Sequence, residues 1–333
     1  MNKKNYHENY EPRRTQSSRR AIINFPLCSP WLYSFGFILL FLLSFSACVR
    51  QEGSRAVQGR DETDSKVFID ALGRRYAPAE YPERIVSLNP AITEILFAIG
   101  AGERVVGVTR YCDYPPEAGT RTSVGGFSGA TVSMEQIHSL EPDLVILSAD
   151  MHSRIVTLLD ELGIQSFAVE PRNFSQVYLT IAVIGEISGC KAGAEEVIAS
   201  MKEKIFGVEE RIRQSERPGV FWVLSEEPLM TAGSESFVSE AIELGGGRNI
   251  FGDIKADWPL VSPEQVLIRR PDWIFMGDDI AGTAMFSTPL WQAFPAVREG
   301  RTVVLKAGIL YRYGPRLADG VAAIAEILHP VIH

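Results

Sequence analysis

The sequence predicts an α/β protein made of two Rossmann-like lobes with parallel sheets, joined by one long bridging helix. Short runs of β-branched residues alternate with longer segments whose apolar residues recur every three or four positions. This rhythm occupies residues 67–172, gives way to an uninterrupted helical pattern over 173–216, and resumes over 217–333. Such an alternation favours parallel sheets that are covered by helices on both faces.

Residues 1–47 precede the predicted fold and have the features of a secretion signal. A basic leader is followed by an uncharged stretch whose apolar centre, residues 31–43, has the length of a signal-peptide core. It ends in Phe-Ser-Ala-Cys at 45–48, which resembles the lipobox of bacterial lipoproteins. We therefore expect cleavage before Cys48 and a lipid on its thiol, with an uncleaved N-terminal anchor as the alternative. Either arrangement places the rest of the chain outside the cytoplasm, in the periplasm or on the outer cell face.

Charge and composition limit the partners of the mature chain. Residues 48–66 are polar and poor in apolar side chains, so we expect a flexible tether there. The whole chain has a formal charge of −8, and loss of residues 1–47 removes six basic and two acidic side chains, which gives −12. An acidic protein of this kind is a poor partner for nucleic acid.

The first lobe contains the βαβ elements in regular order. Buried strands are expected from β-branched, apolar runs at residues 84–88, 105–109, 144–147 and 166–169. Amphipathic helices are expected between them, at residues 93–99, 134–140 and 155–162. Two cysteines, Cys112 and Cys190, fit no metal-binding spacing, and both a disulfide and a pair of free thiols are compatible with the sequence.

The segment 173–216 separates the lobes. Its helical pattern contains no convincing strand and stops at Arg217-Pro218-Gly219, after which a strand is expected at 220–224. A single helical connector would be stiff, so we expect little hinge opening. Bends or a break are expected at four glycines, Gly185, Gly189, Gly193 and Gly207.

An internal repeat is the most informative feature. Residues 133–146 and 262–275 share the pattern S-x-E-Q-[IV]-x4-P-D-x-[IV]-[IF] at an offset of 129. The serine predicts a helix N-cap, the glutamine completes a capping box, and the Pro-Asp pair turns the chain into a strand. Each lobe therefore contains the same helix–turn–strand unit, with Glu135 or Glu264 at the second position of its helix.

These two glutamates admit two interpretations. A carboxylate in the first turn of a helix is favoured by the helix dipole alone, by about 0.3–1 kcal/mol. Their equivalence within a repeat favours a second role, in which one acidic side chain per lobe contacts a basic pocket on a two-fold symmetric partner.

Several stretches resemble class III solute-binding proteins of ABC importers, which bind vitamin B12, haem and ferric siderophores, and are closest to the vitamin B12-binding members. The resemblance extends over residues 67–330 and implies two α/β lobes with the ligand in the cleft between them. It also implies that Glu135 and Glu264 dock onto arginines of a dimeric permease that works with ATPase subunits. The stretches that carry it are residues 84–100, 111–117, 140–145 and 314–316.

A bulky metal chelate needs aromatic walls and a few polar anchors. Loop positions after predicted strands, together with the resemblance, give seven expected ligand-binding residues: Tyr111, Tyr114, Phe127, Trp258, Tyr311, Arg312 and Arg316. The resemblance places Trp258 at a cleft-lining tryptophan of the vitamin B12 binders and Phe127 near another such aromatic. It favours a corrinoid ligand. Haem, with a tyrosine on the iron and arginines on the propionates, and a ferric siderophore are the alternatives. Trp291 is expected in the core.

Features of an enzyme are missing from the sequence. The five histidines have no metal-ligand spacing, and there is no Walker A motif. Residues 245–247 are three glycines that suit a helix end, and residues 126–129 fall short of a nucleophile elbow. We expect no catalytic residue, no resident metal and no cofactor. A surface metal chelatase on the same fold, or an adhesin or sensor module, are the alternatives from other classes.

Overall fold

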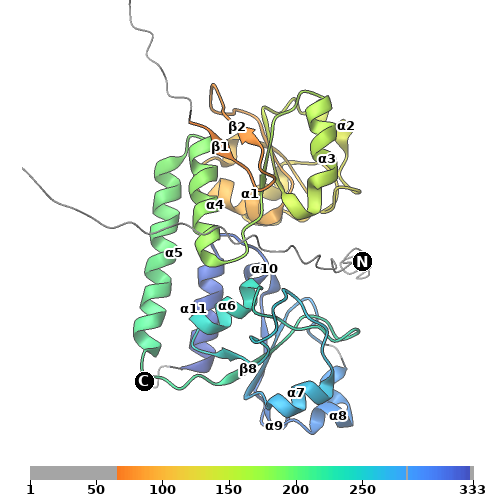
Figure 1. Cartoon of the computed structure of the whole chain (residues 1–333), viewed down its shortest axis with the longest axis vertical. Coiled ribbons are helices and arrows are strands. Elements are labelled where there is room, and N and C mark those ends of the chain that lie inside the picture. The colour runs from red at the N-terminus through yellow and green to blue at the C-terminus, as the bar shows by residue number, and fades with distance from the viewer. Residues whose placement is uncertain (1–65, 283, 331–333) are drawn as a thin grey trace, which may run out of the picture. The chain divides into compact units, whose positions relative to one another are not determined.

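The computed structural model describes residues 66–282 and 284–330, which form two α/β lobes (Figure 1). All of them fall within one compact unit, Arg60–His333. The expected signal at 1–47, the lipid site at Cys48 and the tether up to residue 65 lie outside the described residues. Within the part of the chain that is described, no helix has both the length and the apolar character that a bilayer crossing requires.

The N-lobe is built on a five-stranded parallel sheet of order β5-β4-β3-β6-β7. Its strands are β3 (Ile85–Ser87), β4 (Val105–Val108), β5 (Thr122–Ser123), β6 (Leu144–Ser148) and β7 (Ser166–Val169). Its helices are α1 (Pro90–Ala98), α2 (Met134–Ser139) and α3 (Ala149–Glu161). A short antiparallel hairpin precedes them, β1 (Phe68–Ile69) and β2 (Arg75–Tyr76). The strands and helices expected in this lobe are confirmed. The strand order reverses between β3 and β6, and open α/β sheets bind their ligands outside the carboxyl ends of the strands at such a reversal.

The C-lobe has a four-stranded parallel sheet of order β11-β10-β8-β9. Its strands are β8 (Gly219–Val223), β9 (Arg248–Asn249), β10 (Trp273–Gly277) and β11 (Thr302–Leu305). Its helices are α6 (Phe237–Leu244), α7 (Pro263–Arg269), α8 (Pro289–Gln292), α9 (Pro295–Arg298), α10 (Ala307–Leu310) and α11 (Leu317–Leu328). The strand order reverses between β8 and β10, so the same rule points to the carboxyl edge of this sheet. Trp291 is buried against Phe221 and Phe294, as expected.

The expectation of one helix over 173–216 is wrong in detail, because the segment forms two helices, α4 (Phe174–Ile187) and α5 (Lys191–Ile212), which pack side by side. Gly189 ends α4 in the left-handed region at φ 72°. The amide of Cys190 donates to the Gly185 carbonyl and that of Gly189 to Glu186, the two bonds of a Schellman motif. Gly185 itself lies so close to Ala194 that a side chain there would collide with α5.

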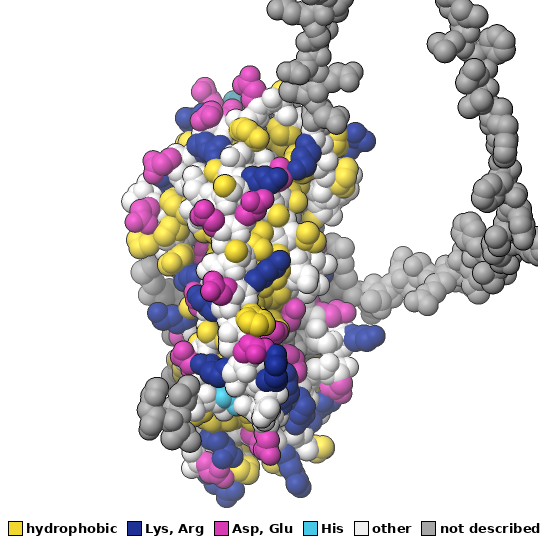
Figure 2. All heavy atoms as spheres, turned by 90° about the vertical axis from the view of Figure 1, so that its left-hand side faces the viewer, with side chains coloured by type: hydrophobic (Ala, Val, Ile, Leu, Met, Phe, Trp, Pro, Cys, Tyr) yellow, Lys and Arg dark blue, Asp and Glu magenta, His cyan; other side chains and the backbone are white. Residues whose placement is uncertain are grey.

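Helix α5 is the long connection between the lobes. It packs against α1 and α4 on the N-lobe side and against α6 and α11 on the C-lobe side (Figure 1). Its 22 residues span about 33 Å at the α-helical rise. Figure 2, which faces this side of the molecule, shows acidic and basic side chains interspersed with hydrophobic ones. The outer face of the bridge is therefore of mixed charge.

One hydrophobic core is shared by both lobes. Successive strand residues point to opposite faces of a sheet. Ile85 and Val220 belong to a single buried cluster that continues through α1, α4, α5, α6 and α11. Their chain neighbours Val86 and Phe221 belong to separate clusters, each confined to its own lobe. One face of each sheet thus packs into the same hydrophobic core, and this shared core joins the lobes more firmly than a flexible hinge would.

The internal repeat is repeated in backbone detail. Ser133 and Ser262 cap α2 and α7 by accepting from the amides of the glutamines three residues later. The residues before the two Pro-Asp pairs, Glu141 and Arg270, have φ of 45° and 48°. The expected capping box is complete at Ser262. It is not closed at Ser133, because the Ser133 amide donates to the Val124 carbonyl instead.

The two cysteines of the folded part are free thiols. Cys112 is buried and lies 3.1 Å from the Thr93 hydroxyl, which donates to its sulfur. Burial raises the pKa of the Cys112 thiol. Cys190 accepts a hydrogen bond from Arg104 at 2.9 Å. Of the two arrangements left open by the sequence, the structure has unpaired thiols.

Candidate ligand cleft and docking faces

An aromatic cluster follows the carboxyl edge of the N-lobe sheet. The rings of Tyr111 and Phe127 meet edge to face at 6.2 Å, and Phe127 meets His152 at 6.5 Å. The Ser148 amide donates to Nδ1 of His152, so the proton lies on Nε2, which donates to the Phe127 carbonyl at 2.9 Å. Burial lowers the pKa of His152 and keeps the ring neutral. His152 therefore holds the backbone of Phe127 in place, a role that the sequence did not indicate.

A second aromatic cluster lies in the C-lobe. Tyr311 follows α10, and its ring lies 5.9 Å, edge to face, from both Trp258 and Trp222. Trp222 is completely buried in the core, whereas Trp258 is half-buried. Burial raises the pKa of the Tyr311 hydroxyl well above its usual range. The pair Trp258 and Tyr311 therefore supplies apolar wall, with the Tyr311 hydroxyl protonated.

The two predicted arginines are committed to contacts between the lobes. Arg312 forms an ion pair with Asp113 at 2.5 Å and donates to the Tyr111 carbonyl at 3.3 Å. Partial burial acts to raise the pKa of Asp113, but the Arg312 guanidinium outweighs it and holds that pKa below its usual value. Arg316 pairs with Glu94 at 2.7 Å.

Tyr114 completes this junction between the lobes. The Arg316 guanidinium stacks on the exposed Tyr114 ring at 3.6 Å, a cation–π contact. Tyr114 and Arg316 are therefore brought together, as are Tyr111 and Arg312. Of the seven expected residues, two form the C-lobe pair, Trp258 and Tyr311. The other five gather where the lobes meet: Tyr111, Tyr114, Phe127, Arg312 and Arg316.

A carboxylate-rich group at the lobe boundary escaped the sequence analysis. The Ser148 hydroxyl donates to Glu170 at 2.7 Å, and burial raises the pKa of Glu170. Arg172 forms ion pairs with Asp150 of the N-lobe at 3.0 Å and with Asp257 of the C-lobe at 3.7 Å. Burial also raises the pKa of Asp257, the neighbour of Trp258. The sequence offered one signal for this group, which is its position: Ser148 ends strand β6 and Glu170 directly follows strand β7.

Residues 66–282 and 284–330 contain no cluster of three or more histidine, cysteine or acidic side chains arranged to hold a metal ion.

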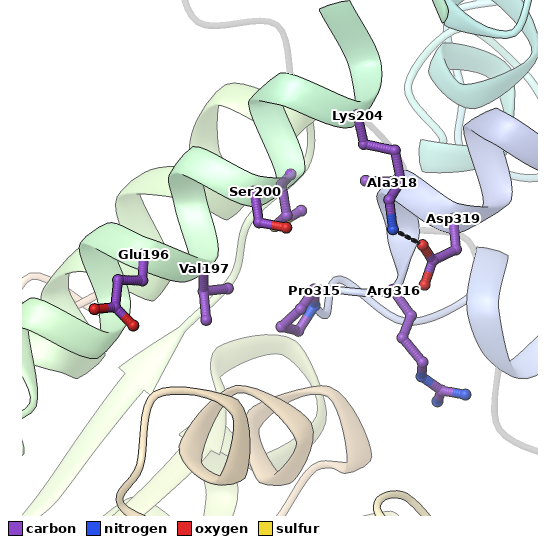
Figure 3. A pocket seen from close by; sticks show the side chains of 9 residues that line it. Glu196, Val197, Ser200, Lys204, Pro315, Arg316, Ala318 and Asp319 are labelled. Carbon is purple, nitrogen blue, oxygen red and sulfur yellow. Dashed lines mark hydrogen bonds and ion pairs between the residues drawn. The ribbon is translucent and has the colours of Figure 1, made fainter. Parts of the chain in front are cut away.

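A separate pocket of about 300 Å³ lies between α5 and the start of α11 (Figure 3). Lys204 of α5 and Asp319 of α11 form an ion pair at its edge. Of the seven expected ligand residues, Arg316 is the one that lines it. This pocket lies beside the bridging helix and not at the carboxyl edges of the sheets, where ligands of α/β proteins bind.

The expected docking glutamates occupy matching places on the two lobes. Glu135 and Glu264 are the second residues of α2 and α7, and both are exposed. The Ser262 hydroxyl beside Glu264 holds the pKa of this carboxyl below its usual value. Both side chains are therefore accessible carboxylates on short, firmly capped helices.

The fold and the inter-lobe aromatic residues define a two-lobed α/β solute-binding protein. Residues 85–308 match the periplasmic binding protein family, and the chain belongs to that family. Proteins of this kind in ABC importers work with a permease and an ATPase, and they are not enzymes. The metal chelatase alternative is therefore wrong.

Relatives agree with this assignment. The chain is 31% identical to an ABC transporter substrate-binding lipoprotein of Bacillus subtilis, YvrC, over 84% of this chain and 90% of that protein. It is 31% identical to a vitamin B12-binding protein of Vibrio cholerae over 74% of this chain and 89% of the relative.

Solved structures show the same fold. The periplasmic vitamin B12 binding protein BtuF of Vibrio cholerae matches with a TM-score of 0.65, covering 74% of this chain and 96% of that one. The haem-binding protein RhuT of Roseiflexus matches at 27% identity with a TM-score of 0.65, over 74% of this chain and 98% of that one. The fold predicted from the sequence, two lobes with parallel sheets and a long bridging helix, is confirmed.

Proposed function

We propose that this chain is the lipid-anchored, extracytoplasmic solute-binding subunit of an ABC importer, and that it carries a corrinoid between its lobes to a dimeric permease. Similarity to vitamin B12-binding proteins supports the ligand class. The lipobox-like sequence at Cys48 and the lipoprotein relative support the anchor. Tyr111, Phe127, Trp258 and Tyr311 are the proposed walls of the site.

The ion pairs of the arginines at the lobe boundary are the observation that favours one ligand class over the others. Arg172, Arg312 and Arg316 are each paired with carboxylates. Glu170 and Asp257 add further acidic groups there, and burial raises the pKa of both. A haem brings two propionates that seek unpaired cations, whereas a corrin ring is fringed with neutral amides. The pairing of these three arginines with carboxylates therefore favours a neutral, amide-bearing chelate.

Haem is the second candidate, because the RhuT relative is a haem-binding protein. A propionate would need Arg312 or Arg316 to leave its carboxylate, or would have to reach Arg110, which lies 5.5 Å from the centre of the Tyr111 ring. The exposed Tyr114 and half-buried Tyr111 would then be the candidates for a phenolate on the iron. An anionic ferric siderophore would meet the same charge conflict as haem.

Titration of residues 49–333 with cyanocobalamin, haemin and a ferric siderophore separates these ligands. Calorimetry and absorbance should show tight one-to-one binding of cyanocobalamin. Haemin binding with a shifted Soret band, without cobalamin binding, would move the assignment to haem. Binding of none of the three would leave the importer class intact and remove the corrinoid proposal.

Glu135 and Glu264 are the proposed contacts to the permease. Changing both to alanine should abolish uptake in cells and leave ligand binding unchanged. Glu161→Ala with Glu203→Ala is the matched control, because these glutamates are also exposed on helices and lie elsewhere. Uptake that survives the first pair of substitutions would overturn the docking assignment.

A further inference from the structure

The two docking helices present different chemistry around equivalent glutamates. In a helix, residues three and four positions apart lie on one face. Around Glu135 in α2 these positions hold His138 and Ser139, both exposed. Around Glu264 in α7 they hold Leu267 and Ile268, whose exposed fractions are 44% and 80%. The repeat therefore keeps the glutamate and changes its surroundings from polar to aliphatic.

Leu260 is a further exposed aliphatic residue, four positions before Glu264 in the chain. It lies just before α7 and is 65% exposed. Its backbone is fixed by a bridge to Met230, and the next amide, of Val261, donates to the Leu229 carbonyl at 3.0 Å. We call Leu260, Glu264, Leu267 and Ile268 the C-lobe face, and Glu135, His138 and Ser139 the N-lobe face.

Packing within the lobe does not account for these exposed aliphatic residues. The buried side of α7 is Val266, completely enclosed in the C-lobe core, and Ile137 takes the same place in α2. Arg269 fixes α7 by a two-pronged contact with Asp253 and by stacking on the Phe251 ring at 4.5 Å. Leu267 and Ile268 are therefore held outward on a rigid helix, a pattern typical of an association surface.

A membrane-embedded permease subunit fits this C-lobe face. Glu264 is an exposed carboxylate, so a partner surface that covers it is favoured when it supplies a cation. The three aliphatic side chains around it require apolar groups beside that cation. Glu264, Leu267 and Ile268 lie on one face of α7, so a single contact area on the partner would meet both the charge and the apolar side chains. The N-lobe face offers charge and hydrogen bonds without comparable apolar area.

We infer that docking is unequal: the C-lobe face supplies most of the affinity through apolar contact, and the N-lobe face supplies a salt-sensitive polar contact. Burial of aliphatic surface depends weakly on ionic strength, whereas exposed ion pairs are screened within about 8 Å at physiological salt. This inference rests on the proposed docking role of Glu135 and Glu264. It adds that a two-fold symmetric permease holds the two lobes with different strengths.

Exchanging the faces within the repeat tests the inference. Leu267→His with Ile268→Ser gives the C-lobe face the composition of the N-lobe face, and His138→Leu with Ser139→Ile does the reverse. Binding of each variant to the importer complex in lipid nanodiscs is measured at low and high salt. The first exchange should weaken binding about tenfold or more at both salt concentrations. The second should retain binding and reduce its salt dependence.

The outcomes are distinguishable from failure of the docking proposal. All substituted side chains are exposed, so unchanged melting temperature and ligand affinity establish that the variants are folded. If Glu264→Ala weakens binding but the first exchange changes it less than twofold, the unequal contact is wrong and docking stands. If neither matters, docking itself is wrong. If the protein is a dimer that the first exchange dissociates, the C-lobe face binds a second copy and the inference is overturned.

Discussion

Arg316 and Glu94 join the two lobes through one buried carboxylate. The Arg316 guanidinium donates to Oε2 of Glu94 at 2.7 Å, and the Arg316 amide donates to Oε1 at 3.2 Å. Glu94 is 2% exposed and Arg316 is 20% exposed at the side chain. These residues lie 222 positions apart in the chain. The close approach of Gly314 to Glu94 leaves no room for a side chain at that glycine.

Removing one partner of this pair should be costly. Arg316→Ala leaves a buried carboxylate without its cation, which is expected to lower the free energy of unfolding by about 3–5 kcal/mol. Urea unfolding followed by circular dichroism measures this. The double variant with Glu94→Ala should lose less than the sum of the two single losses. Strict additivity would show that the two side chains do not act as a pair.

Stability should fall as the pH drops below about 6.5. Burial lowers the pKa of His152 in the folded protein, so the unfolded chain takes up a proton at a higher pH than the folded protein does. Between the pKa of the unfolded chain and that of the folded protein, each decrease in pH therefore favours unfolding. His152→Gln should flatten this part of the profile in denaturant unfolding at pH 5–8. An unchanged slope would mean that other groups cause the loss.

Two aromatic walls of the proposed site should each contribute to ligand affinity. Trp258→Ala and Tyr111→Ala each remove a large face from the proposed site and should weaken cyanocobalamin binding about tenfold or more. Phe206→Ala, on the exposed side of α5, is the matched aromatic control and should leave affinity unchanged. Equal affinity in all three variants would place the ligand elsewhere, for example in the pocket between α5 and α11.

Membrane attachment should depend on one thiol. Cys48→Ala removes the proposed acceptor of the lipid, so the protein should lose fatty-acid labelling and leave the membrane fraction. Cys112→Ala is the control, because that thiol is buried within the N-lobe. Continued membrane association of the Cys48 variant, without labelling of either protein, would favour the uncleaved anchor.

Local patterns in the sequence predicted much of this fold. The strands at Ile85–Ser87 and Gly219–Val223 and the caps at Ser133 and Ser262 follow from short-range signals that their own residues carry. The helix breaks at Gly189, but the sequence does not distinguish this glycine from Gly185, Gly193 and Gly207. Which of them adopts a left-handed backbone conformation depends on the packing of the two helices.

Contacts between distant residues were beyond the reach of those signals. Nothing near Arg316 indicates that its carboxylate partner is Glu94, and nothing near Arg172 indicates Asp257. The role of His152 depends on the Phe127 carbonyl of a separate loop, which the residues around His152 do not indicate. Such pairings depend on how the elements assemble in three dimensions.

The shared core has a consequence for how the chain matures. Its buried cluster needs Ile85 near the beginning of the fold and Ile324 in α11, the last helix described. The C-lobe and the bridging helix α5 cannot complete their packing until α11 has arrived, because α11 packs against α5, α6 and α10. Under the proposed extracytoplasmic location, the chain would cross the membrane unfolded and reach its native packing only once α11 is across. Because the core is shared, heating the folded protein should give one melting transition for both lobes.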